Sequence, residues 1–246
     1  MFEIKNLSVK VRGKNVVSNF SLSINQSELH VLMGPNGSGK SSLANALSGH
    51  PHYEICAGTF MLSGKDMREL LPEERSREGL FVAFQKPVPI PGVPVAAFLK
   101  TVARAHMLHS SPLTIRNDVV LGFERVGLPA GTREREVHVA FSGGESKRLE
   151  VAQLAVVPAK IAILDEPDSG LDLDGFRMIA KEIERLRDNR LGLLIITHNP
   201  NMLAALKPNA LHIMAKGRLV VSGGKELGEE LGTTGFDRWE HAYYDA

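Results

Sequence analysis

The segment from Gly34 to Ser41 narrows the possible folds of this chain more than any other, because it fits the pattern G-x-x-x-x-G-K-[ST]. A short apolar run at 29–33 precedes it, and a helical pattern begins near Ser41. In such a strand–loop–helix unit, glycines let backbone N–H groups surround phosphates, and the helix N-terminus adds a favourable dipole. Lys40 is expected to reach the β- and γ-phosphates, and the Ser41 hydroxyl to bind Mg²⁺. The motif therefore predicts a nucleoside triphosphate site in an α/β fold.

The hydrophobic pattern predicts two kinds of β-structure. The runs 29–33, 161–164 and 193–196 are apolar without alternation, which is typical of parallel strands buried on both faces. Residues 1–33 otherwise alternate apolar and polar side chains around a turn, which predicts antiparallel strands, and 211–221 has the pattern of a hairpin. We therefore expect an α/β core with an N-terminal antiparallel β subdomain.

The character of the chain changes after Gln85. Prolines break it between 87 and 94, and the segments 95–108 and 115–128 then show helical apolar spacing. This indicates a helical subdomain inserted into the core. We expect a single domain in which residues 1–85 and 151–246 form the β subdomain and the α/β core, and residues 86–150 form the helical subdomain.

Two carboxylates follow the apolar run at 161–164. Asp165 and Glu166 would lie at the carboxyl edge of the sheet, where ligands of α/β proteins bind. Asp165 is expected to hold Mg²⁺ directly or through water. Glu166 is expected to orient or deprotonate the attacking water, because phosphoryl transfer mainly needs positioning and charge stabilisation.

A second candidate anion site lies at Phe141-Ser142-Gly143-Gly144-Glu145. Ser142 and Glu145 satisfy a capping box ahead of a helical run, and a Ser-Gly-Gly turn at a helix N-terminus can bind an anion. The P-loop already surrounds the phosphates from its own side. Two copies of the chain that face each other head to tail would give both sites a role.

These segments, in this order, resemble the ABC-type ATPases, and the resemblance covers nearly the whole chain. In that family, Ser-Gly-Gly of one subunit closes on the γ-phosphate held by the P-loop of the other. The resemblance implies ATP and Mg²⁺ as cofactors and an ATP-dependent dimer. It assigns the nucleotide contacts to Gly34, Pro35, Asn36, Gly37, Ser38, Gly39, Lys40, Ser41, Ser42, Ser142, Gly143, Gly144 and Asp172.

The resemblance also assigns roles around the γ-phosphate. Gln85 is similar to the family's Q-loop glutamine, Asp172 to the D-loop aspartate that lies across the dimer seam, and His198 to the switch histidine. It implies that Glu166, His198 and Gln85 are catalytic. It further implies Ser41, Gln85 and Asp165 as Mg²⁺ ligands.

Within the family, the segments 49–54, 80–93 and 168–174 are similar to the ATPases of the Suf iron–sulfur assembly system. Asp168 supports this, because transporter subunits more often carry Thr there. Val11 stands where the family usually stacks an aromatic residue on adenine, which fits the same subfamily and implies weak nucleotide affinity in the monomer. The implied partners are soluble scaffold proteins of the SufB and SufD type, docked near Gln85.

Three features depart from the Suf pattern: Pro167, the pair Asn199-Pro200, and a shortened segment at 105–137. The alternative is the ATP-binding subunit of a membrane transporter, which uses the same site but docks on a permease. A DNA-repair or chromosome-associated ABC ATPase would need long heptad arms or zinc insertions. The stretch between Gln85 and Ser142 contains neither.

Composition excludes several other classes. No stretch approaches the roughly 18 unbroken apolar residues of a membrane span, and the N-terminus begins an alternating strand pattern, so we expect a cytoplasmic protein. With 29 Lys+Arg against 28 Asp+Glu, the chain lacks the strong positive field that nucleic acid binding needs. Cys56 is the only cysteine, which excludes an intramolecular disulfide and a cluster site built by this chain, and we expect a half-buried thiol.

Three further groups have simpler interpretations. His106 and His109 could share a metal, but two ligands make a weak site, and a solvated helix face is the preferred interpretation. The charged run at 133–136 is expected to be solvated. Phe98, Val102 and Ala105 are interpreted as subdomain core, with a docking groove as the alternative.

Overall fold

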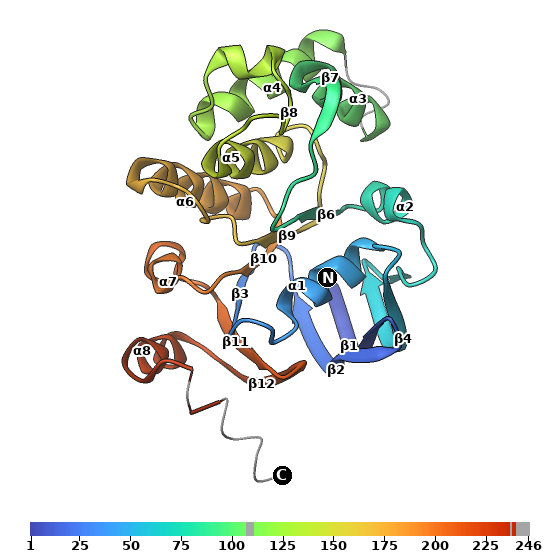
Figure 1. Ribbon diagram of the computed structural model, residues 1–246, viewed down its shortest axis with the longest axis vertical. Coiled ribbons are helices and arrows are strands. Elements are labelled where there is room, and N and C mark those ends of the chain that lie inside the picture. Colours follow the sequence, from blue (N-terminus) through green and yellow to red (C-terminus); the bar gives the residue numbers. More distant parts are fainter. Residues whose placement is uncertain (107–110, 237, 240–246) are drawn as a thin grey trace.

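The computed structural model describes residues 1–106, 111–236 and 238–239, and these residues form three sheets with helices around them (Figure 1). The central sheet has six strands in the order β12-β11-β3-β10-β9-β6. These strands are β3 Leu29–Met33, β6 Leu80–Ala83, β9 Ile161–Asp165, β10 Gly192–Ile196, β11 Ala210–Ala215 and β12 Arg218–Gly223. All pair in parallel except β12, which is antiparallel to β11 and completes the predicted hairpin. The predicted α/β core is confirmed.

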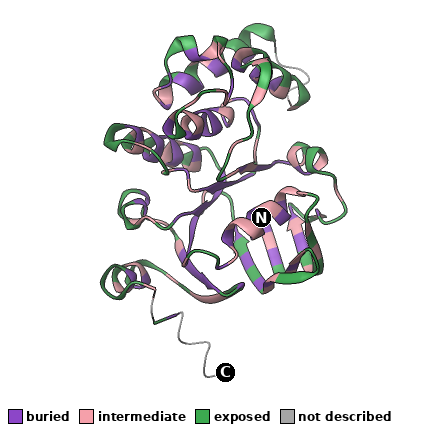
Figure 2. Cartoon of the chain, viewed as in Figure 1, coloured by how far each residue is buried: buried purple, intermediate pink, exposed green. Residues whose placement is uncertain are grey.

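The central sheet is buried on both faces. Every residue of β3, β9 and β10 is buried, which is why their sequences are apolar without alternation. Successive side chains of a strand point to opposite faces, so Val31 and Met33 join one hydrophobic core and Leu32 joins the other. Figure 2 shows the buried strands running through the middle of the molecule.

A second, antiparallel sheet packs beside the helix that follows the P-loop. Its strand order is β2-β1-β4-β5. The strands are β1 Phe2–Val11, β2 Lys14–Ile24, β4 Tyr53–Leu62 and β5 Lys65–Asp66. Ile4 and Val9 of β1 are buried with Leu43 and Leu47 of α1, Lys40–Ser48, in a shared core. The alternation at the N-terminus therefore reflects a sheet that buries one face against α1.

Most of the other helices lie on the side of the central sheet away from the antiparallel sheet, whereas α2 lies beside α1 (Figure 1). The helices after α1 are α2 Pro72–Arg77, α3 Val95–His106, α4 Pro112–Arg125, the 3₁₀ helix η1 Ala130–Glu134, α5 Gly143–Gln153, α6 Leu173–Asp188, α7 Pro200–Leu206 and α8 Lys225–Thr234. A small sheet joins β7, Ile90–Pro94, to β8, Glu136–Val137. No helix within the described ranges has the length and apolarity needed to cross a bilayer.

The helical segment expected at 86–150 contains α3, α4 and most of α5. Helix α4 starts at Pro112 because the Ser111 hydroxyl caps it and accepts a hydrogen bond from the Thr114 amide. Helix α5 continues past the expected boundary to Gln153. The division into subdomains at these exact residues stays a prediction, and the expected helical residues 107 and 108 lie outside the described residues.

Candidate active site

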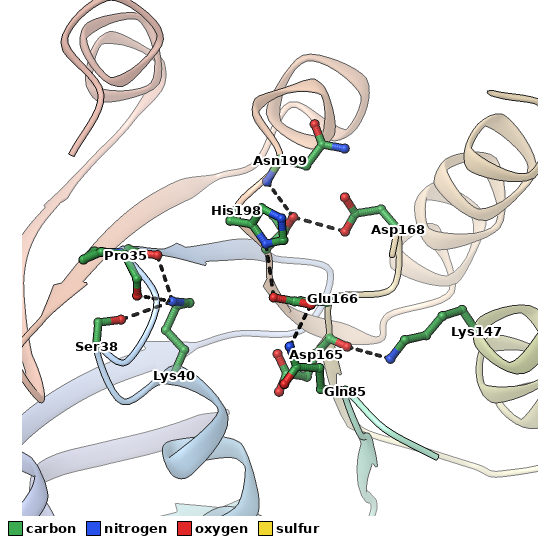
Figure 3. A network of polar contacts seen from close by, with 12 residues as sticks. Pro35, Ser38, Lys40, Gln85, Lys147, Asp165, Glu166, Asp168, His198 and Asn199 are labelled. Atoms are coloured by element: carbon green, nitrogen blue, oxygen red, sulfur yellow. Dashed lines mark hydrogen bonds and ion pairs between the residues drawn. The ribbon is translucent and has the colours of Figure 1, made fainter. Parts of the chain in front are cut away.

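The topology gathers the predicted site residues at one edge of the central sheet. The adjacent strands β3, β10, β9 and β6 are parallel, so their carboxyl ends lie side by side. The P-loop follows β3, and Asp165 ends β9, with Glu166 directly after it. His198 comes shortly after β10, and Gln85 comes shortly after β6. Residues far apart in the sequence therefore meet at this edge, as Figure 3 shows.

The P-loop is closed around the ammonium of Lys40. Its Nζ donates to the carbonyl oxygens of Gly34 and Pro35 at 2.8 and 2.9 Å and to the Ser38 hydroxyl at 3.1 Å. Burial lowers the pKa of Lys40, and the negative charges of Asp165 and Glu166 oppose that effect. The Lys40 ammonium is thus held by oxygen atoms of the P-loop itself, and phosphate oxygens could take the place of these acceptors.

Gly39 allows the tight turn from the P-loop into α1. Its φ is 106°, in the left-handed region, and a Cβ there would lie 2.8 Å from the carbonyl oxygen of Val16. A side chain at this position would push the loop off β2. The backbone conformation therefore requires glycine at position 39 of the motif.

Asp165 and Ser41 form a candidate Mg²⁺ site. The Ser41 side chain interacts with the Asp165 carboxylate, and Asp165 is 2% exposed. Burial raises the pKa of Asp165, and the interaction with Ser41 opposes the shift. Within the described residues, Asp165 Oδ1 is buried without a hydrogen-bond partner. An unpaired buried carboxylate oxygen next to a hydroxyl fits a hard cation with oxygen ligands.

Glu166 lies between Gln85 and His198. Gln85 Nε2 donates to Glu166 Oε2 at 2.8 Å, and His198 Nδ1 lies 3.1 Å from Glu166 Oε1. An ionised carboxylate only accepts, so the proton of a neutral His198 sits on Nδ1. Glu166 has a φ of 51°, unusual for a non-glycine residue, and its amide donates to the Ile196 carbonyl at 2.8 Å. The backbone is thus turned so that the carboxylate bridges the ends of β6 and β10.

The Ser-Gly-Gly turn begins α5 as the sequence predicts. Ser142 Oγ accepts from the Glu145 amide at 3.1 Å, and Glu145 accepts from the Ser142 amide at 2.8 Å, which completes the capping box. Gly143 is exposed, while Gly144 is buried against the backbone of Gly170. No hydrogen bond joins this turn to the P-loop within the described part of the chain.

Asp172 has a role inside the chain. It caps α6 by accepting from the Gly175 amide at 2.8 Å, and it pairs with Arg148 of α5 at 3.1 Å. Its side chain is still 73% exposed. The role of Asp172 across a dimer seam stays a prediction, as do the roles assigned to the other site residues.

The solvated interpretation of 133–136 is wrong for Arg135. Its guanidinium lies 2.6 Å from Glu145, donates to the Ala140 carbonyl at 2.8 Å, and stacks 4.1 Å from the ring centroid of Phe141. Arg135 also lowers the pKa of Glu145. Sequence reasoning missed it because a charge run looks the same whether it faces water or a neighbouring loop.

Two other interpretations need correction. Cys56 is exposed, not half-buried. It lies at a position of β4 that is open to solvent, and its thiol contacts the Ser8 carbonyl at 3.4 Å. His106 is only partly exposed and lies 3.2 Å from the Ser76 hydroxyl, which replaces the expected solvated face. Its expected partner, His109, lies outside the described residues, and no metal-ligand cluster occurs among the residues that are described.

The core interpretation of the α3 stripe is wrong for Ala105, which is exposed, and holds in part for Phe98 and Val102, which are half-buried. Phe98 and Val102 pack against the hydrophobic core. Val102 and Ala105 also line a pocket together with Phe84 and His106. The stripe therefore combines core contacts with a groove next to the loop that carries Gln85.

Comparison with known proteins identifies the family. Residues 17–169 match the family described as ABC transporter. The chain belongs to this family. It is an ABC-type ATPase, which binds and hydrolyses ATP.

Relatives and structures agree with this assignment. The chain is 41% identical over 241 residues to the probable ATP-dependent transporter SufC of Escherichia coli (strain K12), which covers 96% of this chain and 97% of SufC. It is 40% identical over 237 residues to vegetative protein 296 of Bacillus subtilis (strain 168), covering 95% and 91%. The fold is similar to that of a dimeric bacterial ABC transporter cassette, with a TM-score of 0.80 at 19% identity, covering 91% of this chain and 98% of the cassette.

Proposed function

We propose that this ABC ATPase hydrolyses Mg·ATP only when two chains enclose the triphosphate between the P-loop of one and the Ser142 turn of the other. The observation that carries the proposal is the N-terminus of α5. Within the described residues, the amides of Gly143 and Gly144 have no hydrogen-bond partner, and Ser142 and Gly143 are exposed. Unpaired amides at a helix N-terminus favour an anion, and no hydrogen bond within the described residues joins them to the P-loop of the same chain.

The residues around Glu166 support an in-line attack by water. Glu166 accepts bonds from Gln85 and His198 and keeps further lone pairs, so it can also accept the proton of a water. As the water oxygen bonds to the γ-phosphorus, the bond from that phosphorus to the β–γ bridging oxygen breaks, which leaves ADP and inorganic phosphate. Lys40, His198 and the facing α5 amides would stabilise the charge on the γ-phosphoryl oxygens.

Ser41 and Asp165, with Gln85 beside them, would hold Mg²⁺. When bound, the cation neutralises charge on the β- and γ-phosphates. The side chains supply the position: Ser41 is on the first turn of α1, and Asp165 is fixed at the end of β9. Gln85 contacts Glu166, which links the cation ligands to the proposed base.

A mixing experiment tests the dimer seam. Gly143→Asp should fold, because Gly143 has ordinary backbone angles and its added Cβ would meet only the Gly170 Cα at 4.0 Å. The added carboxylate would repel the γ-phosphate of a facing chain, so this variant should bind ATP but not hydrolyse it. Lys40→Ala has the complementary defect in the P-loop.

A heterodimer of the two variants has one composite site with both defects and one with neither. Hydrolysis should therefore return when Gly143→Asp is mixed with an excess of Lys40→Ala. Mixtures that stay inactive although heterodimers form would contradict a site shared between the P-loop of one chain and the Ser142 turn of the other. Activity of Gly143→Asp alone would contradict the seam role directly.

For the partner, we propose soluble scaffold proteins of the SufB and SufD type, whose rearrangement during iron–sulfur assembly the ATPase drives. Full-length similarity to the E. coli protein named SufC supports this. The runner-up, a permease partner, is supported by the word transporter in the same name. Affinity capture of the Glu166→Gln chain with ATP from detergent-solubilised cells distinguishes them: recovery of two soluble scaffold proteins is expected, and recovery of a polytopic permease would overturn the proposal.

A further inference from the structure

A buried ion pair in α5 lies next to the proposed catalytic residues. Lys147 and Glu150 are 4% and 5% exposed, and Lys147 Nζ lies 3.4 Å from Glu150 Oε2. Burying two charges is costly unless every hydrogen-bonding position is used. The additional partners of this pair are therefore informative.

The pair holds the backbone at the ends of two strands. Lys147 Nζ donates to the carbonyl of Phe84 at 2.6 Å and to the carbonyl of Asp165 at 2.9 Å, as Figure 3 shows for Asp165. Glu150 Oε1 accepts from the Phe84 amide at 3.1 Å. Both polar groups of Phe84 are thus bound by α5, and so is the carbonyl that ends β9.

Each of these anchored residues directly precedes a member of the proposed site. Phe84 precedes Gln85, Asp165 precedes Glu166, and Gln85 and Glu166 contact each other at 2.8 Å. The same helix begins at the Ser142 turn. One rigid element therefore contacts the backbone beside both Gln85 and Glu166 and carries the turn proposed to meet the partner chain's nucleotide.

We propose that Lys147 and Glu150 are positioning residues that set the place of Gln85 and Glu166 relative to the Ser142 turn, an inference that rests on the proposed roles of those two residues. The pair contacts the backbone of Phe84 and Asp165. It acts by fixing the backbone, so that movement of α5 at the seam moves the catalytic side chains with it. Burial raises the pKa of Glu150 to about 7, with Lys147 opposing, which reflects how enclosed the pair is.

The decisive variant replaces both charges by apolar side chains of similar length, Lys147→Met with Glu150→Leu. Turnover is measured per nucleotide-binding chain, which removes any loss of folded protein from the comparison. Binding of Mg-free ATP through the P-loop should be unchanged. The kcat should fall at least about ten-fold, because small misplacements of catalytic groups have effects of that size or larger.

Two comparisons separate positioning from stability. Lys147→Met with Glu150→Gln restores an acceptor for the Phe84 amide and should recover part of the lost kcat. Glu182→Leu with Arg185→Met removes another i,i+3 ion pair with a buried glutamate, on α6, and should leave kcat unchanged. In a Gln85→Ala background the Met/Leu substitution should lower kcat by a much smaller factor, because the effects of substitutions at coupled residues are not additive.

Wild-type turnover by the Met/Leu chain would overturn the proposal, as would equal turnover by the Met/Leu and Met/Gln chains or full additivity with Gln85→Ala. The Glu166→Gln chain is measured in the same assay to distinguish failure of the proposed Glu166 role from failure of the positioning role. Full hydrolysis by that chain removes the proposed role of Glu166. An inactive Glu166→Gln chain beside a fully active Met/Leu chain removes only the positioning role.

Discussion

Replacing Arg135 by Leu should impair hydrolysis without weakening ATP binding to the P-loop. Arg135 holds the loop that precedes α5 through Glu145, the Ala140 carbonyl and the Phe141 ring. None of these contacts reaches the P-loop. The substitution therefore loosens the Ser142 turn on one side of the proposed seam and leaves the other side as it is.

The size of the effect follows from the contacts that are lost. The side chain is 36% exposed, so its ion pair with Glu145 contributes about 0.5 kcal/mol. Stacking on Phe141 adds about 0.5–1 kcal/mol, and the hydrogen bond to the Ala140 carbonyl about 1 kcal/mol. If the ordered turn is needed only in the closed dimer, the sum of about 2 kcal/mol lowers the turnover roughly 30-fold.

The assay compares Arg135→Leu with Arg133→Leu as a matched control. Arg133 is two residues away, and within the described residues its side chain makes one hydrogen bond, to the Ala130 carbonyl at 3.0 Å. Steady-state phosphate release, ATP affinity from calorimetry and thermal unfolding are measured for both. Equal turnover in the two variants would refute the reasoning, and so would an Arg135→Leu chain that loses ATP affinity as well.

The remaining predictions concern the P-loop, the proposed base and a buried histidine pair. Lys40→Ala should abolish ATP binding in calorimetry, because Lys40 is the only cation that the motif places against the phosphates; wild-type affinity would exclude the P-loop assignment. Glu166→Gln should bind ATP, lose hydrolysis and double in mass on gel filtration with ATP; full turnover would mean that the carboxylate is assigned wrongly. His212, 3.0 Å from His30, has its pKa lowered to about 4 by burial and by His30. The unfolded chain binds a proton at His212 more tightly than the folded chain does. The free energy of unfolding is therefore highest above a pH of about 6.5 and decreases as the pH falls toward 4, with about 2 kcal/mol lost by pH 5. His212→Gln should flatten that part of the urea-unfolding profile; an unchanged slope would contradict it.

The arrangement of the site was predictable because its residues directly follow sequence patterns that indicate parallel strands. Short apolar runs predict buried parallel strands, and parallel strands place the residues that follow them at one edge. That brings Lys40, Asp165, Glu166 and His198 together from sequence alone. Ser142 and Glu145 were equally accessible, because a capping box is a local pattern that needs no tertiary context.

The missed residues depend on tertiary contacts that no local pattern encodes. Lys147 and Glu150 look like an ordinary i,i+3 surface pair, and only the packing of α5 against the ends of β6 and β9 buries them. Arg135 looked solvated because its partner, Glu145, lies on the next element. Cys56 was misjudged for the opposite reason, because β4 leaves that position exposed.

The absence of an aromatic residue at Val11, the expected adenine position, predicts one effect on ATP affinity and another on dimer closure. Stacking on an aromatic residue contributes about 1–3 kcal/mol, so its loss weakens ATP binding by roughly 5- to 150-fold. A stacking contact that is the same in the open and the closed dimer would not shift the equilibrium between the two. The amides of Gly143 and Gly144 would meet the γ-phosphate only in the closed dimer. We therefore expect this chain to bind ATP more weakly than a chain with adenine stacking, and still to distinguish ATP from ADP through the proposed closure.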